Sequence, residues 1–123
     1  MCIRDSNYSN YSWENVLQSD LSSYSADIVI SSDVIEHISD PIPYIKNMLS
    51  IKDVKYYFIS TPEKFSLYRE KDFGPPSNIH HYREWDSKEF YKFMSEYFDI
   101  EYHMMSNFSQ HTQLIIAKKK KND

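Results

Sequence analysis

The sequence predicts an α/β fold, because two apolar runs flank one segment that starts like a helix. Residues 28–30 read Ile-Val-Ile and residues 56–60 read Tyr-Tyr-Phe-Ile-Ser, without the polar alternation of a half-exposed strand. Asp40 and Pro41 lie between the runs and are typical of a helix start, with aspartate as N-cap and proline in the first turn. This order predicts a right-handed βαβ unit, whose two strands are parallel and buried on both faces.

The chain after residue 84 predicts one further helix and two further strands. Asp86, with Glu89 three residues later, approximates a capping box, so we expect a helix over residues 86–97. Residues 100–105 and 113–117 read as strands joined by a polar turn. We expect these two strands to pair antiparallel.

Composition limits the classes of protein that the chain can represent. Its 123 residues fit one domain at most, and Gly74 is the only glycine, so neither a G-x-G-x-x-G loop nor a P-loop can form. The formal net charge of −4 argues against a nucleic-acid partner, and no apolar run reaches the roughly 18 residues of a membrane span. The lone cysteine, Cys2, excludes a disulfide framework. We therefore expect a cytoplasmic protein with neither a nucleic-acid nor a membrane partner.

Polar and ionisable side chains follow the first predicted strand directly. Ser31 and Ser32 end its apolar run. Asp33, Glu36 and His37 then follow at spacings of three and four residues, which would place them on one face of a helical turn. Open α/β sheets hold ligands at the carboxyl ends of their strands. The sequence therefore predicts a functional site at this edge.

The segment 26–38 resembles the fourth strand of class I S-adenosylmethionine-dependent methyltransferases of the type 11 and type 23 kind. The resemblance includes Asp-Val-Ile-Glu-His at 33–37 and His-Tyr-Arg-Glu-Trp at 81–85, and covers roughly residues 13–118. It implies an α/β fold that is the second half of a Rossmann-like doubly wound sheet, with a terminal antiparallel hairpin. The family's glycine-rich first strand-loop is absent, which implies a carboxyl-terminal fragment.

The ends of the chain are expected to lie outside this domain. The first six residues, Met-Cys-Ile-Arg-Asp-Ser, resemble a translated adaptor at the start of truncated metagenomic reading frames. We interpret residues 1–12 as this artefact and a disordered lead-in, 13–118 as a truncated methyltransferase domain and 119–123 as a lysine-rich tail. Such a fragment should be inactive alone.

The resemblance implies S-adenosylmethionine as the cofactor and assigns it four residues. Ser31, Ser32 and Asp33 would line the cofactor, and Asp20 would reach its adenine amino group. An aspartate that caps a turn explains Asp20 equally well.

The same resemblance implies methyl transfer to a hydroxyl or amine of a small-molecule or glycan-type acceptor. His37 would be the general base, since histidine is the usual group for removing a hydroxyl proton near neutral pH, and Glu36 would assist it. The alternative class is a non-catalytic Rossmann-like binding or scaffold module.

A divalent metal is a second use for the same residues. Some methyltransferases of this class carry a Glu-x-x-Glu-His block that binds a cation, and Asp33-x-x-Glu36-His37 fits its spacing. His80 or His81 could supply a further ligand, and oxygen-rich ligation of this kind suits Mg²⁺ or Mn²⁺. Because the side chain of Asp33 is one methylene shorter than that of glutamate, we favour the reading without metal.

A long polar connection, residues 63–84, is expected to form a lid over the site. It carries the candidate substrate-binding residues His80, His81 and Arg83, of which arginine suits a carboxylate or phosphate on the acceptor. The two histidines could equally be a surface patch of the lid.

Overall fold

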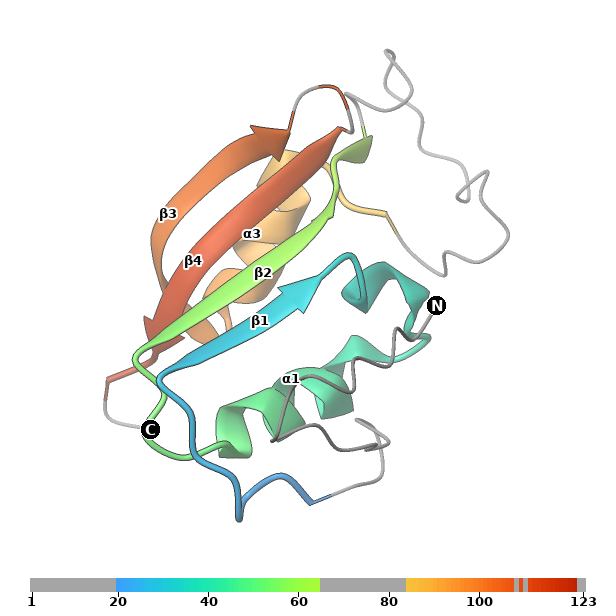
Figure 1. Ribbon diagram of the computed structural model, residues 1–123. Coiled ribbons are helices and arrows are strands. Elements are labelled where there is room, and N and C mark those ends of the chain that lie inside the picture. Colours follow the sequence, from blue (N-terminus) through green and yellow to red (C-terminus); the bar gives the residue numbers. More distant parts are fainter. Residues whose placement is uncertain (1–19, 65–83, 108, 110, 122–123) are drawn as a thin grey trace, which may run out of the picture.

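The computed structural model describes residues 20–64, 84–107, 109 and 111–121. A short 3-10 helix, η1, follows the first strand, and the remaining elements are two helices and four strands within these ranges (Figure 1). In chain order they are β1 (Ile28–Ser32), η1 (Ile35–His37), α1 (Pro41–Ser50), β2 (Tyr56–Pro62), α3 (Ser87–Ser95), β3 (Phe98–Asn107) and β4 (Thr112–Lys119).

The four strands form one mixed sheet in the order β1-β2-β4-β3. β1 and β2 are parallel, with Ile28 opposite Tyr56 and Ser32 opposite Ser60, which confirms the predicted βαβ unit. β3 and β4 pair antiparallel, as predicted, but β4 also pairs antiparallel with β2 and so lies between β2 and β3. The predicted α/β fold with a terminal antiparallel hairpin is therefore confirmed.

The helix starts follow from their capping residues. The Asp40 carboxylate accepts a hydrogen bond from the Ile42 N–H at 3.2 Å, and the Asp86 carboxylate accepts one from the Glu89 N–H at 2.8 Å. The second predicted helix is shorter than expected, because α3 ends at Ser95 and Phe98 already begins β3. Phe98 is apolar and suits either element, so its position in the sheet depends on tertiary packing.

The core lies on one face of the sheet. Side chains from both described helices join one buried cluster there, including Tyr44 and Met48 from α1 and Phe90 and Met94 from α3. Ile59 of β2 is a fully buried strand residue in the same cluster. Figure 1 shows α1 running beside β1 and α3 lying behind β4.

The expectation that the first strand is buried on both faces is wrong for the described part of the chain. Ile28 and Ile30 of β1 are 48% and 72% exposed, whereas Val29 between them packs against the core. The reason is that α1 and α3 both pack against the side of the sheet to which Val29 points. The uninterrupted apolar run therefore predicted a strand correctly, but β1 is less buried than such a run led us to expect.

The two ends of the long connection after β2 lie next to each other. Glu63 and Trp85 form a bridge, and the Lys64 N–H donates to the Trp85 carbonyl at 3.0 Å. Residues 65–83 lie outside the described residues, and so do the candidates His80, His81 and Arg83. No helix within the described ranges is long and apolar enough to cross a membrane.

Candidate functional site

The chain turns sharply where β1 ends. Asp33 has a φ of 53°, in the left-handed region that aspartate enters more readily than most residues. Its N–H donates to the Ser60 carbonyl at 3.1 Å, so the turn is fastened to the neighbouring strand. The predicted helical turn beginning at Asp33 is replaced by this turn and by η1, which begins at Ile35.

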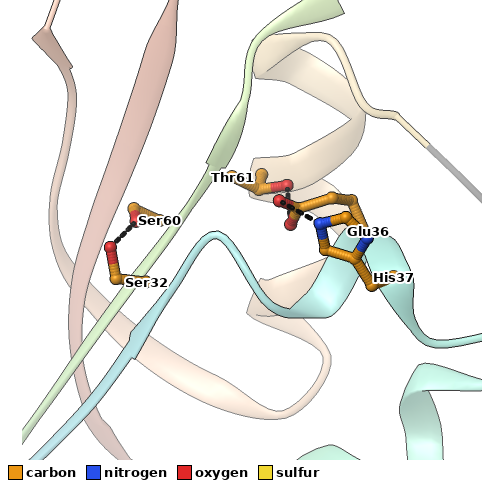
Figure 2. Close-up of polar contacts among 5 residues, drawn as sticks. All are labelled: Ser32, Glu36, His37, Ser60 and Thr61. Atoms are coloured by element: carbon orange, nitrogen blue, oxygen red, sulfur yellow. Dashed lines mark hydrogen bonds and ion pairs between the residues drawn. The ribbon is translucent and has the colours of Figure 1, made fainter. Parts of the chain in front are cut away.

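Glu36 is a buried carboxylate held between η1 and β2. It is 1% exposed, and its Oε2 accepts a hydrogen bond from the Thr61 Oγ1 at 3.0 Å (Figure 2). Burial raises the pKa of Glu36 above its usual value, hydrogen bonds from its own backbone and from Thr61 oppose the rise, and the Asp33 charge adds to it. A raised pKa in a buried carboxyl at a strand edge is typical of functional sites.

His37 stands beside this carboxylate at the surface. Its Nε2 lies 3.8 Å from the Glu36 Oε1, and its side chain is 43% exposed (Figure 2). Glu36 therefore offers one oxygen to Thr61 and the other to the imidazole. A carboxylate in this position can orient the imidazole ring, while the exposed part of the ring faces solvent.

Ser31 and Ser32 point to opposite faces of the sheet, as successive strand residues must. The buried Ser31 hydroxyl lies 2.7 Å from the Tyr44 hydroxyl and joins β1 to α1. Ser32 is exposed and accepts a hydrogen bond from the Ser60 Oγ at 3.3 Å (Figure 2). Of the two serines, Ser32 is the one whose hydroxyl could meet a ligand.

Asp20 caps a local turn. Its Oδ1 accepts a hydrogen bond from the Ser22 N–H at 2.9 Å, and bonding to Ser22 lowers the pKa of its carboxyl. This contact is the alternative that the sequence left open for Asp20, and its assignment to the cofactor adenine stays a prediction.

Sequence reasoning missed Thr61, which follows directly after the predicted strand over residues 56–60. The available signal was its position, because Thr61 follows Ser60 at the carboxyl end of the strand parallel to β1. Parallel strands bring their carboxyl ends to the same edge of a sheet, so a hydroxyl there faces the groups that follow β1.

The described residues fit one side of a cofactor site. Ser32, Ser60 and the exposed Asp33 bring two hydroxyls and a carboxylate to the edge, and these groups suit the polar parts of an amino-acid nucleoside. None of the described residues is a glycine, so a glycine-rich backbone cradle cannot come from them. Within the described ranges, no group of three His, Cys, Asp or Glu residues is placed to hold a metal ion.

A parallel β1-α1-β2 unit, followed by a helix and an antiparallel pair whose last strand inserts beside β2, defines the second half of the class I methyltransferase fold. Glu36 and His37 lie at the carboxyl ends of β1 and β2, the edge at which open α/β sheets hold their ligands.

Comparison with solved structures gives the same fold. The chain is similar to the small RNA methyltransferase HEN1, with a TM-score of 0.67 and 18% identity over 89% of this chain and 16% of that one. It is similar to the methyltransferase domain of bacterial CtHen1-C, with a TM-score of 0.62 and 18% identity over 86% of this chain and 58% of that one. It is also similar to the PH0226 protein of Pyrococcus horikoshii OT3, with a TM-score of 0.61 and 14% identity over 87% and 57%.

These similarities establish the fold. The chain spans less than two thirds of each of these structures. No family model and no curated protein matches the sequence.

The prediction of a small-molecule acceptor and no nucleic-acid partner is wrong in the light of these neighbours, which include a methyltransferase that acts on small RNA. The small-molecule acceptor was what the family resemblance implied, whereas the expectation of no nucleic-acid partner rested on the net charge of −4, which sums over the whole chain. A net charge does not report the charge of the one face that meets a substrate, and this is why it misled.

Proposed function

We propose that this chain is part of an S-adenosylmethionine-dependent methyltransferase that acts on an RNA hydroxyl. The observation that carries the proposal is the buried Glu36, fixed by Thr61 and adjacent to the half-exposed His37, at the carboxyl edge of β1 and β2. The similarity to a small RNA methyltransferase supports RNA as the acceptor class. The hydroxyls of RNA are those of ribose, so a ribose hydroxyl is the acceptor group.

His37 is the group that would take the acceptor proton. When bound, S-adenosylmethionine supplies a methyl group on a good sulfonium leaving group, so positioning and proton removal are the tasks left to the protein. During methyl transfer to the acceptor oxygen, the His37 imidazole would receive the hydroxyl proton. The exposed side chain of His37 is open to solvent, from which the acceptor would approach.

Glu36 is a positioning residue in this scheme. Its Oε2 is committed to Thr61, and this contact sets the direction of Oε1 toward the imidazole. The carboxylate then stabilises the imidazolium that forms when His37 accepts the proton. Ser32, Ser60 and Asp33 would contact the cofactor from the end of β1 and β2.

A cation-assisted form of the same reaction is the alternative that the sequence leaves open. The Asp33 charge raises the pKa of Glu36. Asp33, Glu36 and His37 do not form a three-ligand group in the described part of the chain, so their side chains would have to rearrange before they could hold a divalent cation. Chelation of the complete protein distinguishes the reaction with a cation from the reaction without one.

The proposed function is tested by the acceptor itself. The complete protein that contains this chain should transfer labelled methyl groups from S-adenosylmethionine to single-stranded RNA, and nuclease digestion should recover the label in ribose-methylated nucleosides. Label in the base, or no label in RNA, would contradict the proposed acceptor group. A protein that binds no S-adenosylmethionine would instead be the non-catalytic module.

A further inference from the structure

A shallow pocket lies between α3 and β3. In the strand order β1-β2-β4-β3, β3 is at the opposite edge of the sheet from β1, which leads into the Glu36 site. It has a volume of about 300 Å³ and is lined by Ser87, Lys88, Tyr91 and His103. A second hollow of about 270 Å³ shares Ser87 and His103 and continues along β3. These volumes lie at the small end of ligand pockets, which suits one ring system better than an extended molecule.

The pocket presents an aromatic surface. The rings of Tyr91 and His103 are stacked, with centroids 5.7 Å apart and an interplanar angle of 28°. Phe90 supports His103 from the core at 6.3 Å, edge to face. Tyr91 is 48% exposed, so part of its ring remains open to a further stacking partner.

The contact with Gln113 indicates which ring nitrogen of a neutral His103 carries the hydrogen. The Gln113 side chain is fully buried, and its Nε2 donates to the carbonyls of Trp85 at 3.1 Å and Pro62 at 3.4 Å. Its Oε1 must then be the acceptor for His103 Nε2, which lies 2.9 Å away. Neutral His103 therefore carries its proton on Nε2 and a lone pair on Nδ1, an acceptor for an N–H group.

Gln113 also connects the pocket to the Glu36 site. Pro62, whose carbonyl accepts from Gln113, directly follows Thr61, whose hydroxyl donates to Glu36. Thr61 is paired with Gln113 in the sheet. The paired strands β2 and β4 therefore connect the pocket to the proposed catalytic edge.

The pocket does not suit a phosphate. A helix start often binds anions through its free N–H groups, but here the Glu63 carboxylate accepts from the Ser87 N–H at 3.1 Å. The Asp86 carboxylate accepts a hydrogen bond from the Glu89 N–H in the same turn. Two carboxylates at this end would repel an anion, and Lys88 is the only ammonium among the described residues that line the pocket. An uncharged aromatic ring fits these surroundings better.

We propose that the pocket receives a nucleobase of the RNA substrate, which stacks on Tyr91 while its strand runs to the Glu36–His37 edge. This inference rests on the proposed function, because it takes RNA as the partner. Stacking on an exposed tyrosine is a common way for proteins to hold unpaired bases of single-stranded RNA. Ser87, Lys88 and the Nδ1 of His103 supply hydrogen-bonding groups around the base.

The test is the affinity of the full chain for a fluorescently labelled single-stranded oligoribonucleotide, measured by anisotropy. Tyr91→Ala should weaken binding roughly 5- to 150-fold, the range for loss of one stacked base. Tyr91→Phe keeps the ring and should bind within about twofold of the wild type. Tyr102→Ala is the matched control, because Tyr102 is a 61% exposed tyrosine next to His103 on β3 and does not line the pocket.

Each outcome is decisive. Weaker binding by Tyr91→Ala alone supports the pocket. Equal binding by all four proteins overturns the pocket and leaves the proposed RNA methylation untouched. Absence of RNA binding by the wild-type chain overturns the pocket as well. If binding depends on Tyr91 but the complete protein methylates no RNA, the pocket stands and the proposed function fails.

A cross-link provides a second measurement that does not depend on affinity. RNA carrying 4-thiouridine should cross-link under ultraviolet light to a peptide that contains Tyr91 or His103. Cross-links confined to other peptides would overturn the inference even if Tyr91→Ala weakens binding.

Discussion

The hydroxyl of Thr61 donates a hydrogen bond to the buried carboxylate of Glu36 at 3.0 Å. This contact joins η1 to β2 across 25 residues of sequence, and it is what gives Glu36 a fixed direction beside His37. A hydroxyl that is fully buried and a carboxylate that is almost fully buried form the interior of the candidate site. The interior of the site is therefore built from η1 and the carboxyl end of β2.

Removing the Thr61 hydroxyl should destabilise the protein and weaken catalysis. Thr61→Val keeps the shape of the side chain but leaves the Glu36 Oε2 without this donor, which should cost about 2 kcal/mol of unfolding free energy. Thr61→Ser keeps the donor and should recover most of that loss. Urea unfolding of the three proteins measures the effect, and equal stability of Val and Ser variants would show that the contact is not formed in solution.

Glu36 should give the folded protein a distinctive dependence of stability on pH. Burial raises the pKa of Glu36 in the folded state above its ordinary value of 4.5, so the folded protein binds this proton more tightly than the unfolded chain. The resulting stability is fully present below pH 4.5 and is lost as pH rises through the higher folded pKa.

Glu36→Gln removes this titration while keeping an acceptor for Thr61. The unfolding free energy of the wild type, relative to Glu36→Gln, should therefore fall as pH rises from acidic values toward neutrality. Denaturation at a series of pH values measures the difference. Parallel curves for the two proteins would contradict a raised pKa at Glu36.

The 123-residue chain should bind S-adenosylmethionine weakly or not detectably on its own. The described residues offer hydroxyls and a carboxylate on one side of the cofactor, and the sequence contains a single glycine, Gly74. A glycine-rich loop normally approaches the cofactor with its backbone, and one glycine cannot build it. Isothermal titration calorimetry tests this expectation, and micromolar affinity would point to a binding surface not described above.

Chelation should leave the methyl transfer of the complete protein unchanged if His37 acts as a base without metal. If Asp33, Glu36 and His37 hold a cation, EDTA should abolish the activity and Mg²⁺ or Mn²⁺ should restore it. Glu36→Gln should then be as damaging as His37→Ala, since each removes a ligand. We favour the reaction without metal, because the Asp33 side chain is one methylene shorter than that of a glutamate and reaches less far toward a shared cation.

The local features of the fold could be predicted from sequence, because their causes are local. The capping residue Asp40 and the two apolar runs were sufficient for the β1-α1-β2 unit. The insertion of β4 between β2 and β3 was not predictable in this way, because strand order depends on contacts between residues far apart in the chain. The exposure of Ile30 was missed for a related reason, since burial of a strand depends on what covers its sheet.

The residues of the candidate site divide in the same way, into those that local sequence predicts and those that depend on contacts distant in sequence. Glu36 and His37 were identified by their spacing after a strand, and the structure places them side by side. Thr61 was missed because its partner is distant in sequence, and Ser31 was grouped with Ser32 although strand geometry turns them to opposite faces. Alternation along the strand could have separated the two serines.

In the proposed reaction, His37 removes the proton from an RNA hydroxyl during methyl transfer. The direct measurement is the turnover number of the complete protein with RNA and labelled S-adenosylmethionine, compared with that of His37→Ala. If His37 is the general base, His37→Ala should lose roughly 10²- to 10⁴-fold in turnover, with cofactor affinity nearly unchanged. Turnover of His37→Ala close to that of the wild type would contradict it.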